Sequence, residues 1–295
     1  DRYEGPEVFR KKAEATNDWK NTRIARIYAA YQQKLSTANA LDFDDIIYHT
    51  VTLLQTEPEV LDYYQIDKTF ALHNIPGYPL HAVLCKEGSF TCAVVSVSIT
   101  LTGKTSHAAE PQKGISPIPA MLTIVDELSR WNNTDMQSDD YFLSTIVEIH
   151  VGEEAYGVSA GNGVIRATLR AKTDKLLHQH AEQLKNLVAT ECERTPGLQH
   201  EMEWLEPFSA NENDPQSVSL VKSAAIRNNL PYLELQTPFS WGEDFGLFTQ
   251  QYKGAMFGLG SGENCAPLHS PQYDFPDEVI ETGATLFYTI AEANQ

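Results

Sequence analysis

The chain has 295 residues, of which 42% are hydrophobic and 21% charged, a composition typical of a globular protein large enough for two or three domains. Its formal net charge of −18 argues against a general nucleic-acid or anionic-membrane partner, because Lys and Arg drive binding to phosphates. The sequence contains no run of eighteen apolar residues, so no membrane span is expected. Its four cysteines lack CxxC spacing, which indicates a reducing, cytoplasmic location.

The first 65 residues predict helices only. Apolar residues recur at spacings of three and four within 7–35, which favours one helix there. The acidic stretch LDFDDII suits the start of a second helix over 42–54. Residues 1–65 carry eight Lys and Arg against eleven Asp and Glu, a balance of −3, so binding of nucleic acid by this segment is the weakest functional reading.

From residue 66 onward the pattern changes to short strands and helices separated by Gly and Pro turns. Strands are expected at 69–74, 81–87, 92–103, 141–152, 162–172, 200–206, 232–236 and 254–259. Helices are expected at 117–131, 174–194, 215–229, 241–251 and 277–293. This alternation predicts an α/β fold.

The segment 92–206 reads as strand, helix, strand, strand, helix, strand, which is the split βαβ order of ferredoxin-like domains. Its first strand alternates, with one apolar face made by Val95, Val97, Ile99 and Leu101. In the first predicted helix, the spacing of apolar residues indicates a stripe along one face, made of Met121, Leu122, Val125 and Leu128. Such a sheet packs helices on one face and leaves the other face polar.

Three histidines stand where a strand gives way to a turn: His73 in FALHNIPG, His107 in GKTSHAAEP and His269 in LHSPQYDFPDE. A lone histidine at a strand end is more often a satisfied core residue than a ligand. Three in this position favour a site, because neutral imidazole is a common metal ligand and a good oxyanion stabiliser.

Two smaller patterns favour structural roles. Ser240-x-x-Glu243 has the spacing of a capping box and is predicted to open a helix rather than to act in catalysis. His178 and His180 are two residues apart on a predicted helix, so they point to different faces and are predicted to be solvated.

Four motifs, FALHNIPGYP, EGSFTCAVVSVSITLTGKTSHAAEP, WGEDFGLF and LHSPQYDFPDE, together resemble the aminoacylase and carboxypeptidase-type metallopeptidases over residues 66–295. The amidohydrolase subfamily with hippurate hydrolase and the indole-acetyl-amino-acid hydrolases is the most similar. The resemblance implies a catalytic α/β domain, here partial and made of 66–91 and 207–295. It also implies that 92–206 is an inserted ferredoxin-like βαββαβ lid that makes a homodimer.

Site residues follow from the same resemblance. His73 and His269 correspond to ligands of a two-metal site that holds zinc, manganese or cobalt. His107 corresponds to the lid histidine that polarises the scissile carbonyl, often across the dimer. Arg170 and Asn162 correspond to substrate-binding residues, with Arg170 pairing with a carboxylate. The implied reaction cleaves the amide bond of N-acyl amino acids or small peptides.

The family's remaining ligands belong to a Cys-x-His pair and a Pro-x-Glu-Glu motif upstream of the His73 strand. This chain has no cysteine before Cys85, and its sole Glu-Glu, Glu153-Glu154, is expected in a solvated turn. An incomplete metal site and very low activity of this chain alone are therefore expected.

In place of those motifs, residues 1–65 resemble a helical segment of UvrD-like DNA helicases, including LDFDD, and contain no P-loop. The chain thus reads as a junction of two partial sequences. Two alternatives to an active hydrolase stay open. One is a non-catalytic dimerising or binding remnant of the same fold, and the other, weaker one is a nucleic-acid-binding helicase fragment.

Overall fold

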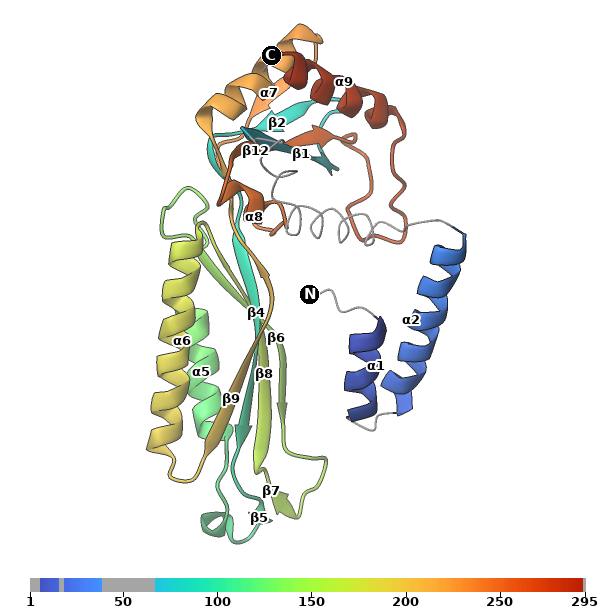
Figure 1. The fold of residues 1–295 in the computed structure, drawn as a ribbon. Coiled ribbons are helices and arrows are strands. Elements are labelled where there is room, and N and C mark those ends of the chain that lie inside the picture. Colours follow the sequence, from blue (N-terminus) through green and yellow to red (C-terminus); the bar gives the residue numbers. More distant parts are fainter. Residues whose placement is uncertain (1–5, 16–18, 39–66, 294–295) are drawn as a thin grey trace. The chain divides into compact units, whose positions relative to one another are not determined.

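The computed structural model describes residues 6–15, 19–38 and 67–293, and the chain divides into two units, Asp1–Ile66 and Asp67–Gln295. In the first unit, α1 (Pro6–Ala15) and α2 (Trp19–Thr37) are separate helices (Figure 1). The rings of Phe9 and Tyr28 meet edge to face with centroids 6.4 Å apart. In one continuous helix they would be about 28 Å apart, so the prediction of a single helix over 7–35 is wrong. The predicted helix over 42–54 lies outside the described residues.

The first sheet of the second unit is assembled from segments that are distant in the sequence. Its order is β1-β12-β2-β11, with β1 parallel to β12 and β12 antiparallel to β2. The strands are β1 (Lys68–Ile75), β2 (Val83–Cys85), β11 (Tyr232–Glu234) and β12 (Lys253–Gly260). Two helices, α7 (Pro215–Arg227) and α9 (Glu278–Ala293), bury apolar side chains against one face of this sheet. Phe257 and Leu286 are fully enclosed there.

The second sheet is antiparallel throughout, with the order β6-β8-β4-β9, and it forms the inserted domain. Its strands are β4 (Ala93–Thr102), β6 (Phe142–Val151), β8 (Asn162–Ala171) and β9 (Gln199–Phe208). Both α5 (Ile118–Arg130) and α6 (Asp174–Arg194) lie against the same face of the sheet (Figure 1). The predicted split βαβ order is confirmed.

The core of the inserted domain follows the predicted alternation on β4. Ile99 and Leu101 are completely buried, whereas Thr102 is exposed. The predicted stripe of α5 is partly wrong, because Leu122 is 66% exposed and Ile124 is buried instead. Met121, Ile124 and Leu128 are spaced by three and four, so they share one face of the helix, and Leu122 falls outside that face.

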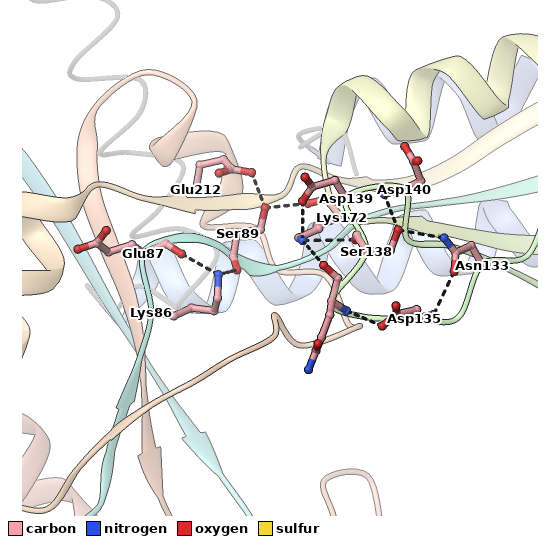
Figure 2. Close-up of polar contacts among 11 residues, drawn as sticks. Lys86, Glu87, Ser89, Asn133, Asp135, Ser138, Asp139, Asp140, Lys172 and Glu212 are labelled. Carbon is pink, nitrogen blue, oxygen red and sulfur yellow. Dashed lines mark hydrogen bonds and ion pairs between the residues drawn. The ribbon is translucent and has the colours of Figure 1, made fainter.

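Two short strands connect the sheets, where the chain enters and leaves the inserted domain. β3 (Gly88–Thr91) pairs with β10 (Asn211–Asn213) in antiparallel register. Figure 2 shows the polar contacts beside them: the single hydrogen of the Ser89 hydroxyl is shared between two acceptors, Glu212 Oε1 at 2.6 Å and the Lys172 carbonyl at 2.9 Å. The Lys172 ammonium in turn meets Asp139 Oδ1 at 3.0 Å. These contacts tie the base of the inserted domain to the β3–β10 pair.

The remaining described elements are short: β5 (Ser106–His107), the 3₁₀ turn η1 (Pro111–Lys113), β7 (Val158–Ser159) and α8 (Gly246–Thr249). Glu153 and Glu154 lie exposed between β6 and β7, as predicted. Within the described parts of the chain, no helix combines the length and the apolarity needed to cross a bilayer.

Candidate functional site

His73 lies near the carboxyl end of β1, opposite Gly258 of the parallel strand β12. Side chains alternate along a strand, and Phe70 and Leu72 pack into the core under α7 and α9. The His73 side chain therefore projects from the opposite face of the sheet. Because β1 and β12 are parallel, their carboxyl ends meet at one edge, the place where open α/β sheets carry binding sites.

Both ring nitrogens of His73 face oxygen atoms. Nδ1 lies 2.7 Å from the backbone carbonyl of Asn74, and Nε2 lies 3.2 Å from Glu243 Oε1. The hydrogen bond to Glu243 raises the pKa of His73 above its usual value, and burial opposes that shift without cancelling it. The arrangement favours a positive charge at this imidazole, either a proton or a cation bound at Nε2.

Glu243 is the residue that the sequence reasoning missed. It was predicted in a capping box that opens a helix over 241–251, and that prediction is wrong because α8 comprises only Gly246–Thr249. Gly242 and Gly246 are poor helix formers, and this signal in the sequence argues against a helix over 241–251. The Glu243 carboxylate instead points at His73, and the Trp241 ring lies against the same imidazole with centroids 4.9 Å apart.

Gly242 explains why this segment comes so close to the inserted domain. A Cβ at Gly242 would lie 2.8 Å from the Phe208 Cβ and 2.9 Å from a Val94 methyl. A side chain at this position would push the Trp241–Glu243 segment away from strands β4 and β9. The close approach therefore requires glycine.

His269 belongs to the segment that follows β12. That segment is bound to the turn after β1 by paired backbone hydrogen bonds, from Gly77 N–H to the Gly262 carbonyl and from Gly262 N–H to the Tyr78 carbonyl. The Asn74 amide also donates to the Tyr273 hydroxyl at 2.5 Å. His269 itself is exposed and has a left-handed backbone with φ of 65°, a strained conformation for a non-glycine residue.

The described residues do not form a two-metal site. Over 6–15, 19–38 and 67–293 there is no cluster of three or more His, Cys, Asp or Glu side chains able to hold a metal ion. His73 and Glu243 are two adjacent donors of suitable chemistry, and His269 does not join them in such a cluster. A dinuclear centre needs more ligands than this pair supplies.

Arg170, at the end of β8 nearest the first sheet, donates from Nη1 to the Ser240 carbonyl at 3.0 Å. It thus contacts the segment that carries Trp241 and Glu243. His107 and Asn162 lie at the opposite end of the inserted domain. Asn162 begins β8 and Arg170 is eight residues further along that strand, so about 26 Å separates them.

The orientation of His107 suits a hydrogen-bond donor. His107 is in β5, which pairs with β7, and its Nδ1 accepts the Ala109 backbone N–H at 3.1 Å. An accepting Nδ1 in a neutral ring places the proton on Nε2. The exposed ring then offers an N–H to an external oxygen.

His180 was predicted to be solvated, and this prediction is wrong. Its ring stacks on Phe142 with centroids 3.7 Å apart, and its Nδ1 is buried without a hydrogen-bond partner in the structure. Burial lowers the pKa of His180. His180 is therefore a partly buried residue that packs on Phe142, not a solvated surface group.

Two family profiles match the chain. The profile of peptidase family M20/M25/M40 matches residues 50–293, and that of the UvrD/REP helicase N-terminal domain matches residues 4–72. The N-acetyldiaminopimelate deacetylase of Lactobacillus helveticus (strain DPC 4571) is 28% identical over 223 residues, which cover 73% of this chain and 56% of the relative. The chain thus spans less than two thirds of the length of the curated relatives it matches.

Solved structures show the same fold. The YXEP protein of Bacillus subtilis, described as a dinuclear metal-binding M20 peptidase, superposes with a TM-score of 0.64 and 19% identity, covering 79% of this chain and 59% of that one. The aminobenzoyl-glutamate utilization protein of Klebsiella pneumoniae gives a TM-score of 0.60 and 16% identity, covering 79% and 56%. Because the M20 profile matches most of the sequence, this chain belongs to peptidase family M20/M25/M40.

Proposed function

We propose that the second unit belongs to a hydrolase that cleaves the amide bond of N-acyl amino acids and releases the free amino acid. The observation that carries this proposal is the half-buried His73–Glu243 pair at the carboxyl edge of β1, in a chain of the M20 family. The deacetylase name of the Lactobacillus helveticus relative supports the same substrate class. More specifically, we propose that the substrates are of the aminoacylase or hippurate type and that the reaction requires a divalent metal ion.

The residues of this chain suggest roles in substrate binding. Arg170 carries a guanidinium next to the Ser240–Glu243 segment, where it can hold the carboxylate of the released amino acid. His107 presents an Nε2–H that can donate to the carbonyl oxygen as negative charge develops there. Asn162 lies at the same end of the inserted domain as His107 and is proposed as a second substrate contact.

His107 lies too far along the inserted domain to reach His73 of its own chain, so we propose a homodimer in which each copy supplies His107 to the other. The edge strand β6 supports this, because an edge strand offers unpaired backbone groups. Val147 and Ile149 on this strand are 62% and 53% exposed. Large exposed apolar side chains on a sheet edge are typical of an interface.

Turnover by this chain alone is expected to be slow, because a general base typically contributes 10²–10⁴-fold and no described cluster supplies both ligands and base. A cytoplasmic location is proposed from the four free cysteines. DNA binding by residues 1–65 is the weakest alternative, and the helicase profile over 4–72 is its only support.

The experiment assays N-acetyl and N-benzoyl amino acids with added zinc, cobalt or manganese, and compares wild type with Arg170→Lys and His107→Ala. Lys cannot form the bidentate pair, so Arg170→Lys should raise KM for free-carboxylate substrates and leave their esters unaffected. His107→Ala should lower kcat. Equal effects of Arg170→Lys on acids and esters, or turnover insensitive to both variants, would contradict the assigned roles.

A further inference from the structure

A small pocket lies at the end of the inserted domain that carries β5 and β7 (Figure 1). Its volume is about 120 Å³, and its lining comes from the loop between β6 and β7, the first residue of α5 and the first residue of β8. An apolar cavity of about 150 Å³ holds a benzene molecule, so this pocket has room for a chain of about six non-hydrogen atoms.

The pocket adjoins both residues at this end of the domain that we propose as substrate contacts. Val158, which lines the pocket, is the cross-strand partner of His107 in the β5–β7 pair. Residues directly opposite in an antiparallel pair project from the same face, with their Cβ atoms about 4.5–5.5 Å apart. Asn162 is itself a lining residue. A ligand whose carbonyl oxygen meets His107 therefore has the pocket within reach of its neighbouring atoms.

Most of the pocket wall is aliphatic. Ile118 and Val151 contribute large side chains, and Ala155 and Ala160 contribute methyl groups. Gly152 has a φ of 65°, and a Cβ there would lie 2.9 Å from the Ala160 Cβ, so the loop approaches Ala160 this closely only with glycine. Such a wall suits a methylene chain, because both surfaces lose contact with water on binding.

Glu153 carries the one ionisable side chain among the residues that line the pocket. It is exposed, so its carboxylate stays charged at neutral pH and accessible to a ligand. The neighbouring Ser159 hydroxyl is already engaged, because it lies 2.8 Å from the Ser106 hydroxyl and accepts the Ser106 backbone N–H at 3.0 Å. The charge of Glu153 therefore decides which end group the pocket favours.

We propose that this pocket binds the side chain of the substrate and selects a short aliphatic chain that ends in an ammonium group. The methylene groups lie against the aliphatic wall, and the ammonium group meets the Glu153 carboxylate. The inference rests on the proposed function, because it specifies the amino acid within the N-acyl substrate. In the proposed homodimer, each copy supplies this pocket to the other together with His107.

The first test uses two probes that need no catalysis. Ligand-observed NMR on the full chain measures the dissociation constants of pentylamine and of pentanol, its neutral counterpart of the same size. Wild type should bind the amine about fivefold more tightly, which is the upper end of what an exposed ion pair contributes. Raising the sodium chloride concentration from about 0.05 M to about 1 M should remove most of this preference, because salt screens exposed charges.

Matched variants locate the binding. Glu153→Gln keeps the size of the side chain and removes the charge, so it should bind the two probes equally. Glu154→Gln is the control, because Glu154 is exposed on the same loop and does not line the pocket, and it should keep the preference for the amine. Ala155→Leu fills the pocket and should weaken the binding of both probes.

The inference is overturned if wild type binds amine and alcohol equally, if Glu153→Gln keeps the preference, or if Glu154→Gln loses it as well. It is also overturned if Ala155→Leu binds both probes as wild type does, because the probes then bind elsewhere.

Turnover separates this inference from the proposed function. The ratio of kcat/KM for Nα-acetyllysine to kcat/KM for Nα-acetylnorleucine should exceed one and fall about fivefold in Glu153→Gln. Turnover with equal kcat/KM for the two substrates would overturn the inference and leave the proposed function standing. Amine binding that depends on Glu153, without turnover of either substrate, would refute the proposed function and leave the ammonium pocket standing.

Discussion

Removal of the Tyr273 hydroxyl should loosen the segment that carries His269. The Asn74 amide donates to this hydroxyl at 2.5 Å, and both groups are partly buried. Tyr273→Phe deletes one oxygen and retains the ring, so the Asn74 amide loses its partner. A donor left unsatisfied in a buried place costs about 1–3 kcal/mol, and partial exposure puts the expected loss at the lower end, about 1 kcal/mol.

The asymmetry of hydrogen bonding makes this prediction specific. Asn74→Val also breaks the contact, but it leaves no buried amide, and the double variant Asn74→Val with Tyr273→Phe replaces both partners by apolar groups. The double variant should therefore lose less unfolding free energy than the two single variants lose together, with a coupling energy of about 0.5–1 kcal/mol.

Two measurements check the prediction. Urea denaturation gives the free energy of unfolding of the four chains in the cycle. Native-state proteolysis reports local opening of 262–277, which global unfolding can hide. Strictly additive losses, or a Tyr273→Phe chain as stable and as protease-resistant as wild type, would show that the Asn74–Tyr273 contact contributes nothing.

Two further predictions concern the inserted domain. Burial lowers the pKa of His180 below its usual 6.5, so the folded chain takes up this proton less readily than the unfolded chain, and stability should fall as the pH drops below about 6.5. His180→Phe keeps a ring that can stack on Phe142, so its free energy of unfolding should fall less between pH 7.5 and 5 than that of wild type. His178→Gln, a change at an exposed position, should leave the fall unchanged. A fall that is the same in His180→Phe as in wild type would contradict this prediction. Ile149 lies with Val147 on the exposed edge strand, so Ile149→Lys should convert the proposed dimer to a monomer. Light scattering at tens of micromolar measures this change, and a dimer retained in the variant would place the interface elsewhere.

Local sequence patterns predicted the strands and helices whose apolar residues repeat with a single regular spacing. The alternation of Val95, Val97, Ile99 and Leu101 identified β4 and its buried face, because each of these positions sees the same sheet surface. The helix over 174–194 was predicted with its observed bounds, since its N-cap, Thr173, accepts from the Leu176 backbone N–H and its apolar stripe has helical spacing. Strand ends elsewhere were correct to within a few residues.

Predictions failed where a distant contact decides the conformation. Phe9 and Tyr28 pack as neighbours on two helices although the apolar pattern runs on between them. His180 lies two residues from the exposed His178, and the Phe142 ring on another element decides that it is covered. In each case periodicity gave the face of an element without the partner that packs on it.

The sequence by itself determined that this chain is an α/β protein with an inserted split βαβ domain and that His73 lies near the end of a strand in an M20-like motif. Its side-chain periods and turn residues are local properties, which a linear pattern can carry. Only the tertiary structure decided that Glu243 faces His73. That contact depends on β1 pairing parallel to β12 and on Gly242 approaching the inserted domain, and such long-range packing leaves no periodic trace in the sequence.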